Sequence, residues 1–132
     1  MLKEREQSWI ADAQADLDAA RLLSENGYPH LAVFEARQAV EKLLKVCYPV
    51  LKGKPMPREH SLQAMVHVVF GRIPEPVWDI IKRLNPFYMS TRYVDAAGGP
   101  PSMRFRDEDG RAAVAMAEEA FAWILAQLTA SS

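Results

Sequence analysis

The sequence has only one cysteine, Cys47, among its 132 residues. A disulfide framework needs at least two cysteines, so none is expected, and a single thiol suits a reducing cytoplasm. The longest stretch without a charged side chain covers residues 120–132, which is too short to span a bilayer. The charged residues 3–6 lead into polar sequence rather than into the apolar core of a secretory signal. We therefore expect a cytoplasmic protein that does not enter a membrane.

Motifs of common catalytic and metal sites are missing as well. The histidines, His30, His60 and His67, form no closely spaced pair with one another or with Cys47, and there is no H-E-x-x-H. The chain also lacks G-x-S-x-G and the glycine-rich phosphate loops G-x-x-x-x-G-K and G-x-G-x-x-G. Cys47 lies in an apolar stretch, which favours a buried, unreactive thiol over a nucleophile. We expect no metal site and no cofactor.

The formal net charge of -1 hides an uneven distribution of charge. Residues 1–36 carry three basic and seven acidic side chains, and residues 107–132 carry one basic and five acidic side chains. The block between them, residues 37–106, carries twelve basic and five acidic side chains, a net charge of +7. Such a block can produce a local positive field in a protein that is neutral overall. The alternative is a set of lysines that merely solvate a helix face.

Nine prolines and six glycines occur in clusters that divide the chain. Both residue types fit the ends of helices and disfavour their interiors, so the segments between the clusters are predicted to be helical. No pair of strands is indicated. We predict an all-α protein: a single domain over residues 1–132 that forms an antiparallel up-and-down bundle of about five helices. The expected helices cover residues 3–25, 29–50, 60–70, 75–85 and 108–129, with one long loop over 86–106.

Individual residues indicate where these helices end and which faces they bury. Gly27 is expected to end the first helix in a left-handed conformation. Ser61 and Asp107 are expected to cap the starts of the third and the fifth helix. Trp78 belongs to the apolar stripe of the fourth helix and is expected to be buried with it.

The long loop has an unusual composition. Residues 87–95 include two tyrosines, Tyr88 and Tyr93, together with Arg92, two hydroxyl side chains and Asp95. A guanidinium offers a fork of donors that fits phosphate, and a tyrosine can stack on a base while its hydroxyl donates a hydrogen bond. The loop could therefore bind a nucleotide. Alternatively, its aromatic residues anchor it to the bundle and Arg92 pairs with Asp95.

Four groups of residues, in this order along the chain, resemble the HEPN domains, a family of nucleotide-binding domains of higher eukaryotes and prokaryotes. The groups are Ala13-x-x-Asp16-Leu17-x-x-Ala20, Phe34-x-x-Arg37-Gln38-Ala39-Val40-Glu41-Lys42-x-x-Lys45, His60-Ser61-Leu62 and Tyr88-x-x-x-Arg92-Tyr93-x-Asp95. The resemblance covers nearly the whole chain. It departs from the family pattern at Val94, where a proline usually follows the Arg-Tyr pair.

The resemblance implies an all-α bundle, commonly a two-fold dimer, with a groove for a nucleotide or RNA. Small prokaryotic members are often encoded beside a minimal nucleotidyltransferase, with which they form two-component, frequently toxin–antitoxin, modules. Many members of the wider family are metal-independent ribonucleases that use an arginine and a histidine four to six residues apart. No histidine of this chain follows an arginine at that spacing, and Arg58 is too close to His60.

The leading hypothesis is therefore a non-catalytic HEPN protein that binds a nucleotide, a nucleotidyltransferase partner, or both. Arg92 would contact phosphate, the tyrosines would stack, and Asp95 would orient Arg92. The residues assigned to this nucleotide site are Tyr88, Arg92, Tyr93, Asp95, Lys42, Lys45 and His60.

Two alternatives remain open. The first is a ribonuclease toxin that cleaves RNA through His60 with Arg92 or Arg58. The second is a dimeric scaffold without affinity for nucleotides. In a dimer, Glu41 and Lys42 could be contacts between subunits rather than parts of a site.

Overall fold

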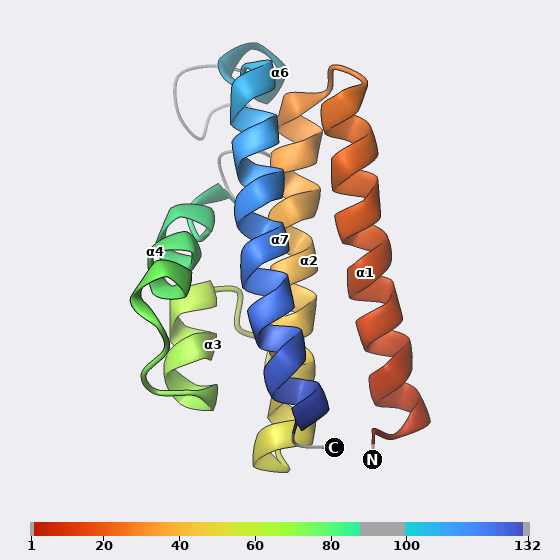
Figure 1. Ribbon diagram of the computed structural model, residues 1–132, viewed down its shortest axis with the longest axis vertical. Coiled ribbons are helices and arrows are strands. Elements are labelled where there is room, and N and C mark those ends of the chain that lie inside the picture. The colour runs from red at the N-terminus through yellow and green to blue at the C-terminus, as the bar shows by residue number, and fades with distance from the viewer. Residues whose placement is uncertain (1, 88–99, 131–132) are drawn as a thin grey trace.

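The computed structural model describes residues 2–87 and 100–130, and every regular element in these two ranges is helical. Three long helices lie side by side: α1 (Glu4–Glu25), α2 (Pro29–Cys47) and α7 (Asp107–Ala130) (Figure 1). Two shorter helices, α3 (Leu62–Val69) and α4 (Glu75–Leu84), pack beside α2 and α7. The predicted all-α bundle is thus confirmed. Within the described ranges, none of the helices combines the length and the apolar character that a membrane span requires.

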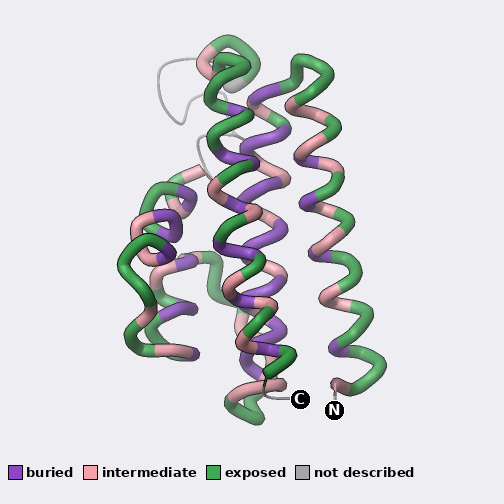
Figure 2. The backbone as a smooth tube through the Cα atoms, viewed as in Figure 1, coloured by how far each residue is buried: buried purple, intermediate pink, exposed green. Residues whose placement is uncertain are grey.

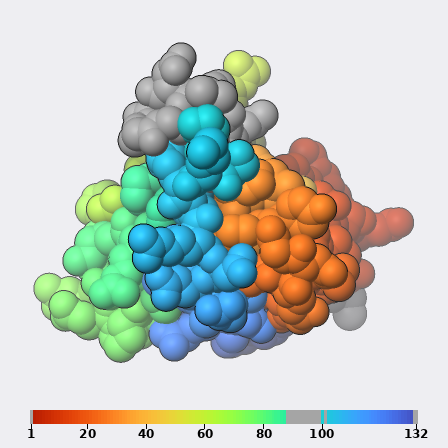
Figure 3. All heavy atoms as spheres, turned by 90° about the horizontal axis from the view of Figure 1, so that it is seen from above, coloured from red at the N-terminus to blue at the C-terminus, as the bar shows by residue number. Residues whose placement is uncertain are grey.

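Two pairs of consecutive helices form antiparallel hairpins: α1 with α2, and α3 with α4 (Figure 1). The chain ascends in α1 and descends in α2, and then descends in α3 and ascends in α4. In contrast, α7 runs in the same direction as its neighbour α2, because the chain returns to the upper end of the bundle before α7 begins (Figure 1). Seen from that end, α7 lies between the α1–α2 hairpin and the α3–α4 pair (Figure 3).

Helix α2 is the centre of the bundle. Twelve of its 19 residues are buried, so several of its faces contact neighbouring helices (Figure 2). Alanines on the facing helices, such as Ala13 and Ala20 of α1 and Ala117 of α7, are fully buried and allow a close approach. A helix buried on several sides has little exposed surface for polar groups. Any charged residue on it therefore needs a partner inside the protein.

The predicted helix ends are confirmed at two positions and wrong at a third. Gly27 has the left-handed φ of 83° after α1, and the Ser61 hydroxyl accepts a hydrogen bond from the Ala64 N–H at 3.1 Å. Asp107, however, does not cap α7, because it is already the first helical residue. The carboxylate of Asp109, two residues further on, instead accepts from the Arg106 N–H at 2.8 Å. This is the reach-back bond of a capping box, which places the acid at the third helical position.

Two expected segments also differ from the structure. The second helix ends at Cys47 rather than near residue 50, and the chain continues as a wider π-helical turn, η1 (Tyr48–Lys52). Pro49 explains the change, since it has no N–H for a regular helical hydrogen bond. Within the long loop, Pro101–Arg104 form a short helix, α6, because a proline at the first helical position suits a helix start. The predicted burial of Cys47 is confirmed, and burial raises the pKa of its thiol.

Candidate functional site

A buried ion pair lies on α2. The side chains of Arg37 and Glu41, one helical turn apart, are each only 2% exposed, and Arg37 Nη1 donates to Glu41 Oε1. The same guanidinium donates to the backbone carbonyl of His60, and through Nε to the carbonyl of Asn85 at 3.1 Å. Arg37 thereby connects α2 to the residue before Ser61 and to the end of α4. Hydrogen bonds of this kind are what allow a charge to remain buried.

Glu41 brings two further side chains to the same point. Its Oε2 lies 3.1 Å from His60 Nδ1 and 3.2 Å from Lys45 Nζ. Burial raises the pKa of the Glu41 carboxyl, but hydrogen bonds from Arg37 and His60 and the charges of Arg37 and Lys45 outweigh it, so this pKa lies below its usual value. Glu41 is therefore an anion that can only accept hydrogen bonds. It follows that His60 Nδ1 carries the proton, and in the neutral ring Nε2 is then an acceptor.

Asn85 completes this arrangement at the end of α4. Its Oδ1 accepts from the Leu62 N–H at 2.7 Å, and its Nδ2 lies 3.1 Å from Gln63 Oε1. Asn85 thus fastens the end of α4 to the start of α3, while its carbonyl is bound by Arg37. We call Arg37, Glu41, Lys45, His60 and Asn85 the Glu41 cluster. Tyr88, the first residue of the predicted loop motif, follows Asn85 by three positions in the chain.

An aromatic contact joins the residues on either side of the loop motif. The rings of Phe87 and Phe105 meet edge to face, with their centroids 5.9 Å apart. The Arg104 guanidinium lies 5.3 Å from the centre of the Phe105 ring. Beside this contact is a hollow of about 480 Å³ lined by Phe87, Arg104, Phe105, Asp109, Ala112, Ala113 and Met116. A hollow with these apolar and aromatic walls suits a planar apolar group.

The structure brings together two of the seven predicted site residues, Lys45 and His60. Lys42 lies elsewhere: its Nζ is 2.8 Å from Asp12 Oδ2 and 2.8 Å from Asp16 Oδ2, both on α1. Burial lowers the pKa of Lys42, but these two carboxylates outweigh it and raise the pKa. The remaining four residues, Tyr88, Arg92, Tyr93 and Asp95, are outside the described residues.

The alternative in which Glu41 contacts a second subunit is wrong. Its side chain is 2% exposed and is engaged by Arg37, Lys45 and His60 of the same chain. Sequence reasoning did not assign Arg37 or Asn85 to the site. A signal for Arg37 was present, because an arginine and a glutamate four residues apart on a largely apolar helix indicate a buried pair.

Glu35 of α2 tests the charge interactions between α2 and α1, because its pKa depends on Asp16 of α1 and on Lys42 of α2. Burial raises the pKa of the Glu35 carboxyl, the charge of Asp16 raises it further, and Lys42 partly offsets both. A carboxyl with a raised folded-state pKa costs stability when ionised, and that cost disappears as the pH falls and the group is protonated. Glu35→Gln is therefore expected to increase the free energy of unfolding at pH 7 by about 0.5 kcal/mol, the size of one like-charge contact.

Urea denaturation at pH 7 and at pH 4 measures this gain, which should shrink at the lower pH. Glu119→Gln is the matched control, since Glu119 is an exposed glutamate in the middle of α7. An equal change in the two variants, or a gain that grows toward acid, would contradict the assignment.

The fold and the cluster define a class of protein: an all-α bundle around a central helix that carries a buried Arg–Glu pair. The model of one family, described as the HEPN domain, matches residues 6–128. The chain therefore belongs to the HEPN domain family, as the motifs of the sequence indicated.

Solved structures agree with this assignment. The protein TT1696 from Thermus thermophilus is 26% identical, with a TM-score of 0.85 over 96% of this chain and 100% of the other. ST0689, described as an archaeal HEPN homologue, is also 26% identical, with a TM-score of 0.79 over 96% of this chain and 99% of the other. Among curated proteins, none matches this chain significantly.

Proposed function

We propose that this HEPN protein binds the phosphate groups of a nucleotide or of RNA at the Glu41 cluster, without cleaving the ligand. One observation carries the proposal: a single buried carboxylate holds Lys45 and the half-exposed His60 ring beside one another. Lysine binds phosphate through its ammonium group, and a histidine does so when both ring nitrogens carry protons, so that Nε2 donates to the phosphate while Nδ1 donates to Glu41. A buried anion that orients both side chains removes part of the entropy cost of ordering them on binding.

Three further features support the proposal. The loop motif with Tyr88, Arg92 and Tyr93 begins three positions after Asn85 in the sequence. The cluster and the motif both lie in the basic block 37–106, which favours an anionic ligand. The hollow beside Phe87 and Phe105 offers apolar walls for a base. Lys42 is left out of the proposed site, because two carboxylates already neutralise it.

The partner is proposed on family membership alone. A minimal nucleotidyltransferase is the expected second component of a two-component, toxin–antitoxin-like module, and the chain itself is expected to be a homodimer. Neither expectation is needed for phosphate binding at the Glu41 cluster.

Calorimetric titration with ATP tests the proposed site. Loss of one charge-assisted contact costs about 1.5–3 kcal/mol, so Arg92→Ala and Lys45→Gln are each expected to raise Kd by about ten- to a hundredfold. Lys54→Gln is the matched control, because Lys54 is an exposed lysine of the same basic block that lies outside the cluster.

Two outcomes would contradict this proposal. The first is the absence of saturable binding by the parent, and the second is unchanged affinity in Arg92→Ala and Lys45→Gln.

A separate assay addresses catalysis, because Glu41 orients His60 much as an acid orients a catalytic histidine. If RNA is cleaved without added metal and His60→Ala abolishes the cleavage, the ribonuclease alternative replaces the non-catalytic one.

A further inference from the structure

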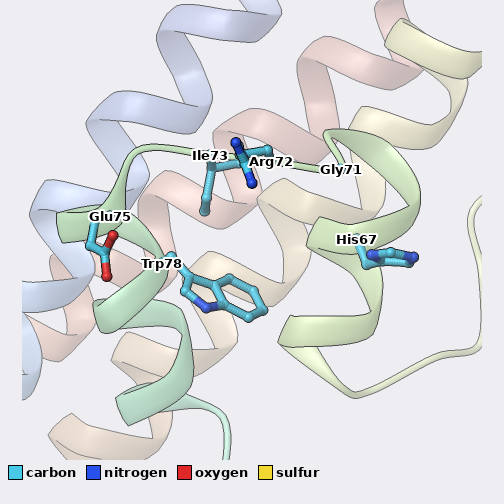
Figure 4. A pocket seen from close by; sticks show the side chains of 6 residues that line it. All are labelled: His67, Gly71, Arg72, Ile73, Glu75 and Trp78. Atoms are coloured by element: carbon cyan, nitrogen blue, oxygen red, sulfur yellow. The ribbon is translucent and has the colours of Figure 1, made fainter.

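A second cavity lies at the turn between α3 and α4. It has a volume of about 630 Å³ and is lined by His67, Gly71, Arg72, Ile73, Glu75 and Trp78 (Figure 4). These residues come from the end of α3, the connection after it and the start of α4. At the opposite ends of the same two helices lie Asn85 of the Glu41 cluster and Leu62, whose N–H donates to the Asn85 side chain. The cavity is therefore separate from the proposed phosphate site, and its size falls within the range of small-molecule pockets.

The position of Trp78 is the first reason to regard this cavity as a binding site. The sequence predicts that Trp78 is buried with the apolar stripe of α4, and Ile81 and Leu84 of that stripe are fully buried. Trp78 is only partly buried, and its indole borders the cavity (Figure 4). Among the described residues, no group accepts a hydrogen bond from its indole N–H. An indole exposed at a cavity offers both a stacking face and a donor.

The charged side chains of the cavity are the second reason. Arg72 and Glu75 are exposed, and neither forms an ion pair with any residue that the structure describes. In contrast, the buried Arg37 and the largely buried Lys42 both form ion pairs. In Figure 4, Arg72 lies above the indole, Glu75 lies on the side of Trp78 away from its ring, and His67 lies across from the ring on α3.

We propose that this cavity binds a small anionic molecule with a planar ring and an amino group. The ring would stack on Trp78, and the anionic group would pair with the Arg72 guanidinium and the His67 imidazole. Glu75 would accept a hydrogen bond from the amino group, as carboxylates do from the exocyclic amines of bases. Two sources share this chemistry: an aminopurine nucleotide and an aromatic amino acid.

NMR of the full-length protein tests the proposal through the indole N–H resonances of the three tryptophans. Trp78→Phe, which retains an aromatic ring, identifies the Trp78 resonance. One arm titrates adenosine monophosphate and, as its counterpart without the amino group, inosine monophosphate. The other arm titrates phenylalanine and 3-phenylpropionate. At least one amino-bearing probe is expected to shift the Trp78 resonance saturably, while the Trp9 resonance of α1 stays in place.

Three variants make the result specific. Arg72→Gln is expected to weaken binding at least tenfold, whereas Arg111→Gln, which alters an exposed arginine of α7, should leave it unchanged. Glu75→Gln should reduce the preference for the probe with the amino group. Thermal unfolding of each variant reports whether the fold is retained.

The proposal is overturned if neither arm shifts the Trp78 resonance at millimolar concentration, or if Arg72→Gln binds as tightly as the parent. It is also overturned if Lys45→Gln abolishes the shift, because the effect would then originate at the Glu41 cluster. These outcomes do not depend on whether that cluster binds ATP, so either proposal can be overturned while the other stands.

Discussion

Replacing Glu41 with alanine is expected to lower the free energy of unfolding by about 3–5 kcal/mol, measured by urea denaturation at pH 7. The variant removes the Glu41 carboxylate from the Arg37 guanidinium, which is only 2% exposed, although the carbonyls of His60 and Asn85 still accept from it. Small domains are stable by about 5–15 kcal/mol, so the loss would be a large fraction of the total.

A double variant separates the stability of the Arg37–Glu41 pair from its function. Arg37→Met with Glu41→Leu replaces both charges by apolar side chains and is expected to be much more stable than Glu41→Ala alone, since neither charge of the pair remains buried. It should nevertheless bind ATP weakly, because Lys45 and His60 lose the carboxylate that holds them. If the double variant binds ATP like the parent, the cluster serves stability only.

The pH dependence of stability is a further consequence of the Glu41 cluster. The pKa of Glu41 is depressed below its usual 4.5, so the stabilisation from its ionised form is complete above that value. This stabilisation is lost as the pH falls through the depressed folded-state pKa. Compared with the parent, Glu41→Gln should therefore lose less stability between pH 5 and the acid range, about pH 2–3. If the parent and Glu41→Gln lose stability in parallel as the pH falls, the pKa of Glu41 is not lowered as assigned.

Leu44→Ala is expected to lower the free energy of unfolding by about 2–5 kcal/mol. Leu44 lies on the central helix α2 and is fully buried, so the truncation removes apolar contacts and leaves a cavity among closely packed helices. Urea denaturation measures the loss, with one m-value, the slope of the free energy of unfolding against urea concentration, fitted to both the parent and the variant.

Leu22→Ala is the matched control for Leu44→Ala. Leu22 is also a helical leucine, but it lies near the end of α1 and is 61% exposed. Its replacement should change the free energy of unfolding by less than about 0.5 kcal/mol. Similar losses in the two variants would mean that α2 is not the centre of the core.

The helices could be predicted from the sequence because their signals are local. Apolar spacing within α1, α4 and α7 and the prolines and glycines between segments depend on residues a few positions apart. Hence the five principal helices were predicted with ends within a few residues. The predicted end of the second helix and the predicted cap of the fifth were wrong, at Pro49 and Asp107, because each depends on whether single residues lie inside or outside a helix. The energies that decide such ends are about 1 kcal/mol.

The candidate site depends on the packing of the helices. Lys42 and Lys45 are three residues apart on α2 and were expected to serve one ligand together. A helix turns about 100° per residue, so their directions differ by about 60°. On a helix surrounded by neighbours this difference is decisive: Lys42 reaches the carboxylates of α1, and Lys45 joins Glu41.

The sequence by itself therefore determined the fold class, the family and the residue types available for binding an anion. Only the tertiary structure decided which of them meet. His60 is 19 positions from Glu41 along the chain, and Asn85 is 48 positions from Arg37. Their contacts form only because the ends of α3 and α4 dock against the middle of α2. Helical periodicity acts over a few residues, whereas contacts at these separations are set by how whole helices bury their apolar faces together.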